Sequence, residues 1–152
     1  MNKWMQRAVE LALVNIEQGG QPFGAILVKD EEIIGEGVNE LHLRPDSTGH
    51  AELLAVRRAQ EKLQSMDLTG TVMYASGAPC PMCFGAMAMA GVDRAYFANS
   101  LEDAISVGLS RSSEVYVDLL KLENERSFQM IHMPVKDDEK NPMHIWHKYN
   151  GE

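Results

Sequence analysis

The chain has few cysteines and few basic residues, and both shortages restrict its function. Only Cys80 and Cys83 occur among 152 residues, which excludes a small secreted domain built on disulfides. Lys and Arg number 14 against 22 Asp and Glu, so the net charge is −8. An acidic surface repels phosphate backbones, and the composition therefore disfavours broad nucleic-acid binding.

No secretion signal is visible, because charged residues interrupt the first helical stretch. Charged residues are missing altogether from 68–92, a segment long enough to span a bilayer. Gly77, Pro79 and Pro81 break this segment, so we expect a buried strand, a loop and a buried helix instead. We therefore expect a soluble cytoplasmic protein that makes no contact with membranes.

Hydrophobic periodicity and turn residues predict an α/β fold. We expect helices over residues 3–17, 50–64, 79–90, 114–122 and 144–149. We expect strands over residues 24–28, 32–38, 71–75, 94–98 and 127–133. A short polar turn joins the first two strands into a hairpin, which makes the five-stranded sheet mixed. No repeat or linker is visible, so residues 1–152 are predicted to form a single domain.

Two short motifs stand at the starts of predicted helices. The first is His50-Ala51-Glu52, and the second is Pro79-Cys80-Pro81-Met82-Cys83. A CxxC motif at a helix start lets both sulfurs face one point, and the helix dipole favours their thiolate form. Taken alone, the two cysteines are equally consistent with buried thiols or with a thioredoxin-like redox pair.

The combination of the two motifs favours a catalytic zinc site. Such a site has three protein ligands and one open position, and His50, Cys80 and Cys83 are three suitable ligands. Glu52 follows His50 by two residues, about 200° around a helix, so it does not share the ligand direction of His50. We expect Glu52 to act beside the metal as a proton carrier. A redox pair would need neither His50 nor Glu52.

The spacing H-x-E … P-C-x-x-C, with 29 residues between His50 and Cys80, is the signature of zinc nucleobase deaminases. Over roughly residues 5–110 the sequence resembles the cytidine deaminase-like superfamily, and most closely its branch of bacterial guanine deaminases and small nucleobase deaminases. The segments that carry this resemblance are 20–25, 36–39, 50–52 and 79–87. The resemblance implies a three-layer sandwich with a central mixed sheet, a homodimer, and a C-terminal segment from about residue 135 that covers the active site.

The motifs and the resemblance together predict a hydrolytic deaminase that uses Zn2+. With zinc on His50, Cys80 and Cys83, Glu52 moves protons from water to the ring nitrogen and to the leaving ammonia. By resemblance, Asn39 hydrogen-bonds the base and Phe23 forms a wall of its pocket. The predicted substrate-binding residues are Asn39, Phe23, Ala51, Ala78 and Ser110.

Two departures from the guanine-deaminase pattern concern the substrate. Ala78 stands where that branch usually has Glu, and Ser110 stands where an acid is expected. Guanine presents two adjacent donors, and the loss of a charged hydrogen bond costs about 1.5–3 kcal/mol. We therefore predict a free nucleobase or related heterocycle, purine or pyrimidine, that bears an amino group, with guanine not the best substrate. A larger or modified base could use the space beside Ala78. Cytosine or a related aminopyrimidine or triazine fits this prediction.

Three alternative functions share part of this pattern. A guanine deaminase proper has the same motifs. A tRNA adenosine deaminase shares the zinc motif, but the net charge of −8 is unfavourable for holding a polyanion. A non-enzymatic zinc module is disfavoured because structural zinc normally has four protein ligands, and the sequence has no third Cys.

Overall fold

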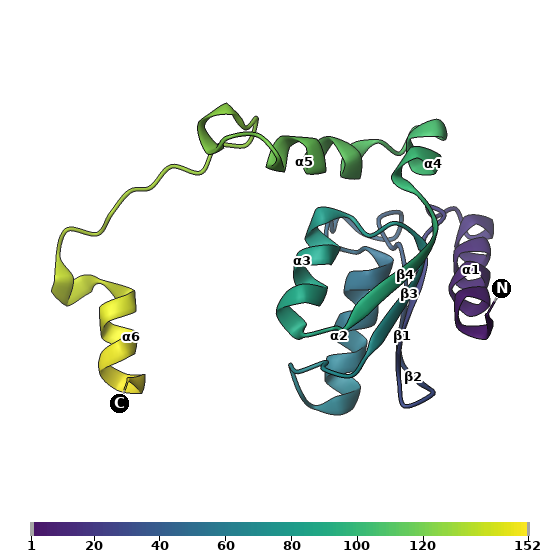
Figure 1. Ribbon diagram of the computed structural model, residues 1–152, viewed down its shortest axis with the longest axis horizontal. Helices are drawn as coiled ribbons and strands as arrows, with labels where there is room; N and C mark the ends of the chain where they lie inside the picture. Colours follow the sequence, from purple (N-terminus) through teal and green to yellow (C-terminus); the bar gives the residue numbers. More distant parts are fainter. Residues whose placement is uncertain (1, 152) are drawn as a thin grey trace. The chain divides into compact units, whose positions relative to one another are not determined.

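The structure is a computed structural model that describes residues 2–151. These residues form two compact units, which divide between Val117 and Asp118 (Figure 1). The single domain over residues 1–152 and the covering role of residues from about 135 stay predictions.

The first unit contains a mixed sheet of four strands. They are β1 (Gly24–Lys29), β2 (Glu32–Val38), β3 (Val72–Gly77) and β4 (Arg94–Asn99). Their order is β2-β1-β3-β4, with β1 antiparallel to both neighbours and β3 parallel to β4. The predicted α/β class and the hairpin are confirmed. The predicted fifth strand is wrong for the described residues.

The segment predicted as that fifth strand, Ser127–Met133, has no regular structure. The backbone N–H groups of Ser127 and Phe128 point to the carboxylate of Asp118, at 2.8 and 3.4 Å. The side chains of Phe128, Met130, Ile131 and Met133 are exposed. Apolar residues predicted a strand, but a strand also needs a neighbouring backbone, and within residues 2–151 none pairs with this segment.

Helices cover both faces of the sheet in the first unit (Figure 1). The helix α1 (Lys3–Glu17) packs on one face, and α2 (Ala51–Leu63) and α3 (Pro81–Ala90) lie on the other. This arrangement gives the three layers that the resemblance implied. The charge-free segment 68–92 folds as predicted, into β3 and α3. Within residues 2–151, no helix is long and apolar enough to cross a membrane.

Two further helices follow β4. The helix α5 (Arg111–Leu119) begins three residues before the predicted 114–122. The short helix α4 (Leu101–Ser106) was not predicted. Its signal was present in the sequence, since Ser100 and Asp103 form a capping box in which each side chain accepts from the other's backbone N–H.

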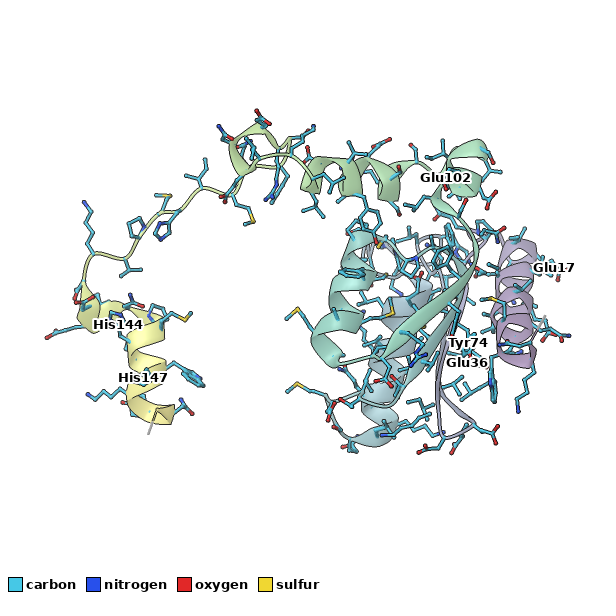
Figure 2. All side chains as sticks on the ribbon, in the orientation of Figure 1. Glu17, Glu36, Tyr74, Glu102, His144 and His147 are labelled. Atoms are coloured by element: carbon cyan, nitrogen blue, oxygen red, sulfur yellow. The ribbon has the colours of Figure 1, made fainter. Side chains whose placement is uncertain are left out.

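The second unit contains two 3-10 turns, Glu123–Glu125 and Asp138–Lys140, and the helix α6 (Pro142–Asn150). This helix corresponds to the predicted 144–149. It carries His144 and His147 (Figure 2), and the His144 ring nitrogen Nδ1 lies 3.4 Å from a carboxylate oxygen of Asp138. Neither histidine belongs to the cluster of metal-ligating residues found within residues 2–151.

A pair of glycines lets α2 lie directly against strand β2. A Cβ atom at Gly37 would overlap the carbonyl oxygen of Ala51, and one at Gly35 would overlap that of Ala55. The strand backbone therefore contacts the helix backbone closely. This contact positions the first turn of α2, where the motif His50-Ala51-Glu52 stands.

We expect Gly37→Ala to destabilise the fold by about 1–3 kcal/mol, the usual cost of overpacking a tight contact. The control is Gly85→Ala in the interior of α3, where a new Cβ meets nothing within 4 Å. Alanine favours a helix by about 0.5–1 kcal/mol over glycine, so the control should be neutral or stabilised. Urea unfolding of both variants checks this, and equal stability of the two would contradict the close approach.

Candidate active site

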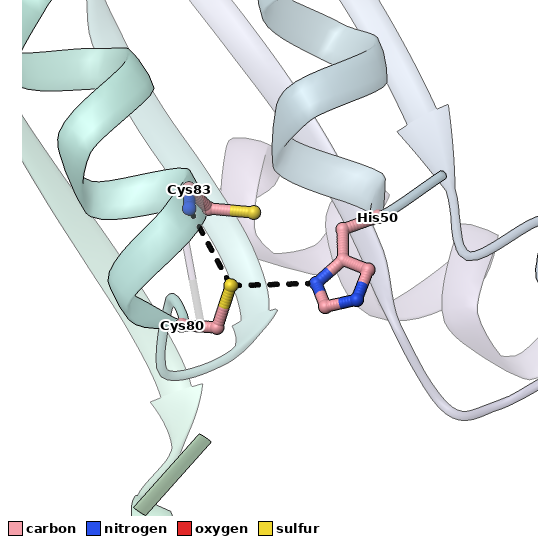
Figure 3. Close-up of side chains that lie close together, drawn as sticks. All are labelled: His50, Cys80 and Cys83. Atoms are coloured by element: carbon pink, nitrogen blue, oxygen red, sulfur yellow. Dashed lines mark hydrogen bonds between the residues drawn. The ribbon is translucent and has the colours of Figure 1, made fainter. Parts of the chain in front are cut away.

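Three side chains that can ligate a metal meet between the starts of α2 and α3 (Figure 3). The ligand atoms of His50, Cys80 and Cys83 all lie within 4.8 Å of one another. The His50 Nδ1 atom is 3.4 Å from the Cys80 sulfur. Zinc binds sulfur at about 2.3 Å and imidazole nitrogen at about 2.0–2.1 Å, so ligands on one ion stand at about this separation. The three residues therefore fit a metal ion.

The local backbone explains why these side chains converge. His50 is the N-cap of α2 and Cys80 is the N-cap of α3, and both have extended backbones. Pro81 occupies the first helical position, where its missing N–H costs nothing. The Cys80 sulfur accepts a 3.4 Å hydrogen bond from the backbone N–H of Cys83. Each ligand is thus held at a helix start, as the sequence predicted.

The two thiols differ in their tendency to ionise. Hydrogen bonds from Cys83 and His50 lower the pKa of the Cys80 thiol to about 4, against the effect of burial. The hydrogen bond to Cys80 and burial raise the pKa of the Cys83 thiol. The hydrogen bond to Cys80 also raises the pKa of His50. Cys80 is therefore the sulfur of the pair that ionises more readily.

Glu52 is buried beside this group. Only 5% of its surface is exposed. Burial raises the pKa of its carboxyl group above the usual value, and the neighbouring Cys80 charge acts in the same direction. A carboxyl group with a raised pKa is suited to both accepting and returning a proton near neutral pH.

A cavity of about 750 Å³ opens onto His50, Glu52 and Cys80. Phe23, Asn39 and Ala78 also line it. This volume is within the range of small-molecule sites.

The other two predicted substrate-binding residues lie elsewhere. Ala51 is 1% exposed and packs in the hydrophobic core, and it is not among the residues that line the cavity. The Ser110 hydroxyl donates to the Glu114 carboxylate at 2.7 Å, while the neighbouring Leu109 and Arg111 line the cavity.

Sequence reasoning missed two residues around the site. Tyr116 donates its hydroxyl to the carbonyl of Pro79 at 2.8 Å and so fixes the residue before Cys80. Gln21 lines the cavity, and its side-chain oxygen accepts from Asn39 Nδ2 at 3.2 Å. Gln21 stands in the segment 20–25 that carries the family resemblance, which is a signal that could have found it, whereas Tyr116 lies outside every motif and the fold alone brings it to the site.

Comparison with known proteins identifies the family of this chain. The sequence matches the MafB19-like deaminase family over residues 1–131. The chain belongs to the MafB19-like deaminase family. The predicted resemblance to cytidine deaminase-like proteins is thereby confirmed. As a family member the chain is a deaminase, which means a hydrolytic enzyme that acts on C–N bonds.

The relatives of this MafB19-like deaminase include a guanine deaminase and a tRNA-specific adenosine deaminase. Guanine deaminase of Bacillus subtilis is 34% identical over 147 residues, which is 96% of this chain and 93% of that protein. A solved structure of guanine deaminase from Bacillus subtilis matches with a TM-score of 0.89, covering 100% of this chain and 98% of that chain. A tRNA-specific adenosine deaminase of Buchnera aphidicola is 40% identical over 66% of this chain and 66% of that protein.

A further solved structure contains a ligand. It is a complex with 2,6-diaminopurine, and it matches with a TM-score of 0.65 and 33% identity over 69% of this chain and 59% of that chain.

Proposed function

We propose that this deaminase is zinc-dependent and releases ammonia from a free nucleobase or related heterocycle that bears an amino group. The observation that carries the proposal is the buried carboxyl group of Glu52 beside the His50, Cys80 and Cys83 cluster, at a cavity of about 750 Å³. A structural zinc module would have a fourth protein ligand and no cavity. The relative that binds 2,6-diaminopurine supports a small heterocyclic substrate.

Each residue of the site has its own role in this reaction. His50, Cys80 and Cys83 would hold the zinc ion, which when bound lowers the pKa of water toward neutrality. Glu52 accepts the proton of the attacking water and returns protons to the ring nitrogen and to the departing ammonia. Asn39 orients the base through its side-chain amide, and Phe23 forms a wall that excludes water.

Guanine is predicted not to be the best substrate. Ala78 lines the cavity and offers no side-chain acceptor, and the Ser110 hydroxyl is already used by Glu114. Without two carboxylate partners for its N1–H and 2-amino donors, guanine should turn over a hundredfold more slowly than a matching base, at about 1.5–3 kcal/mol for each lost bond. Rates of ammonia release on guanine, cytosine, isocytosine and adenine measure this. A tenfold lead for guanine would contradict the prediction.

A tRNA adenosine deaminase is the second candidate, because a relative with that name is 40% identical over 66% of this chain. The net charge of −8 opposes it, since a tRNA substrate requires many phosphate contacts. A tRNA anticodon stem belongs in the same substrate panel. Deamination of the stem alone would establish this candidate, and deamination of free bases alone would exclude it.

We also propose a cytoplasmic homodimer. The α3 and β4 elements expose large apolar side chains, with 62% of Phe84, 92% of Met89 and 50% of Phe97 accessible. Clustered apolar exposure of this kind is typical of a protein interface. Light scattering at micromolar concentration should give twice the 16.9 kDa of one chain. A monomer under these conditions would contradict the dimer.

A further inference from the structure

Two side-chain amides stand next to each other at the wall of the cavity. Asn39, the residue expected to bind the base, is 1% exposed, and Gln21 is half-buried. The Asn39 Nδ2 atom donates to Gln21 Oε1 at 3.2 Å. These two residues follow different elements, the first helix and strand β2, so the pair exists only in the folded chain.

A single backbone donor fixes the direction of both amides. The N–H of Leu41 donates to Asn39 Oδ1 at 3.1 Å, and a backbone N–H can only donate. The Asn39 oxygen must therefore face Leu41, and its NH2 group must face Gln21. Since that group donates, Gln21 must present its oxygen to Asn39. The NH2 group of Gln21 is then the free end, and within residues 2–151 no hydrogen-bond acceptor contacts it.

The buried side chain of Asn15 holds the pair rigidly. Its NH2 group donates to the backbone carbonyl of Gln21 at 2.8 Å and to that of Asn39 at 2.9 Å. Gly20 lies so close to Asn15 that a Cβ atom at this position would collide with the amide. One amide of α1 thus joins the backbones that carry both pocket residues. The backbones of both residues are therefore held in place before a substrate binds.

We propose that Gln21 is a specificity-determining residue, whose free NH2 group donates a hydrogen bond to the substrate beside Asn39. The proposal rests on the proposed nucleobase deaminase function and adds a chemical requirement to it. Each amide oxygen already accepts one hydrogen bond, whereas one N–H of Asn39 and both N–H groups of Gln21 have no protein partner within residues 2–151 and are the donors left for a substrate. The preferred base must therefore carry acceptors on the edge that faces them, such as a ring oxygen substituent or an unprotonated ring nitrogen.

The first arm of the test changes the free end of Gln21. Gln21→Glu keeps an acceptor for Asn39 but replaces the donor with a negative oxygen, and Gln21→Met removes the donor without adding charge. We expect kcat/KM on the best base of the panel to fall about tenfold to a hundredfold in Gln21→Glu and less in Gln21→Met, mostly through KM. The control Gln18→Glu adds the same charge at an exposed position outside the cavity and should match wild type.

The second arm removes the acceptor from the substrate. For a purine the probes are its 3-deaza and 7-deaza analogues, and for cytosine the probe is 4-aminopyrimidine, which lacks the exocyclic 2-oxo group. The analogue that lacks the contacted acceptor should bind to wild type and to Gln21→Met with equal affinity, because its hydrogen bond to Gln21 is already lost. The parent base should bind more weakly to Gln21→Met than to wild type. Calorimetric titration measures both. A general disturbance of the pocket would instead weaken the parent and every analogue by the same factor.

The outcomes separate this proposal from the proposed function. If wild type deaminates a free base but Gln21→Glu and Gln21→Met match it, the role of Gln21 is wrong and the function stands. An equal loss on the parent base and on all analogues also overturns the contact. If wild type releases ammonia from none of the free bases, the proposed function fails, and the calorimetric comparison still decides whether Gln21 binds an acceptor.

Discussion

Replacing Glu52 with Gln is expected to lower kcat by about 10²–10⁴-fold, the usual contribution of a positioned general acid–base group. The amide has the same shape but cannot accept the proton of water or return one to the leaving ammonia. Because Glu52 is not a metal ligand, the variant should keep its zinc. Steady-state ammonia release and elemental analysis of the same sample measure the two effects. An active Glu52→Gln enzyme would contradict the mechanism.

The same substitution is expected to raise the folding stability of the metal-free protein at pH 7. Burial raises the pKa of the Glu52 carboxyl in the folded chain, so the folded state favours the protonated form. In metal-free wild type, the contribution of the protonated Glu52 to folding stability is fully present below the unfolded pKa of 4.5 and is lost as pH rises through the folded pKa. Metal-free Glu52→Gln has no carboxyl group at this position, so its stability does not fall with pH for this reason. It should be more stable than wild type at pH 7, and urea unfolding at pH 4 should bring the two closer together.

Much of the fold follows from local signals in the sequence. The hairpin β1–β2, the helix α2 and the β3–α3 segment each have both a periodic apolar pattern and a turn or cap at their ends, and their bounds lie close to the prediction. The segment 127–133 has an apolar pattern alone. Pairing depends on a partner strand, which a local pattern cannot specify.

The metal cluster could be predicted because each of its members stands at a helix start. Helix starts bring backbone direction and side-chain direction together, so short spacings carry geometric information. The cavity wall could not be predicted in this way. Ala51 follows His50 directly and its side chain packs in the core, while Gln21 reaches the cavity through a loop held by Asn15. Such positions depend on contacts between distant segments.

The role of the glycines in β2 also depends on contacts between distant segments. Nothing in the local sequence shows why positions 35 and 37 need glycine, since both stand inside a segment that has the pattern of a strand. Their role depends on the backbone of α2, which lies against them. Local patterns therefore predict the elements and the ligand spacing, and tertiary contacts determine how closely the elements approach.

Replacing Cys83 with Ser is expected to abolish both metal binding and activity. Cys83 has no exposed surface, and its pKa is raised by its hydrogen bond to Cys80 and by burial. A buried hydroxyl ionises far less readily than a thiol, so the variant retains only His50 and Cys80 as ligands. Two protein ligands do not hold zinc tightly, because catalytic sites normally use three. Elemental analysis should find one zinc per chain in wild type and essentially none in the variant.

The control for this substitution stands on the same helix. Ala88→Ser introduces the same hydroxyl group at an exposed position of α3 outside the active-site cavity, and it should keep both zinc and activity. Ligand loss also predicts a pH effect, since zinc must displace the proton of the Cys83 thiol and so binds more weakly as pH falls. Competition with a chromogenic chelator between pH 6 and 8 should show this slope in wild type. A Cys83→Ser protein with a full zinc ion, or an active protein free of zinc, would overturn the proposed metal site.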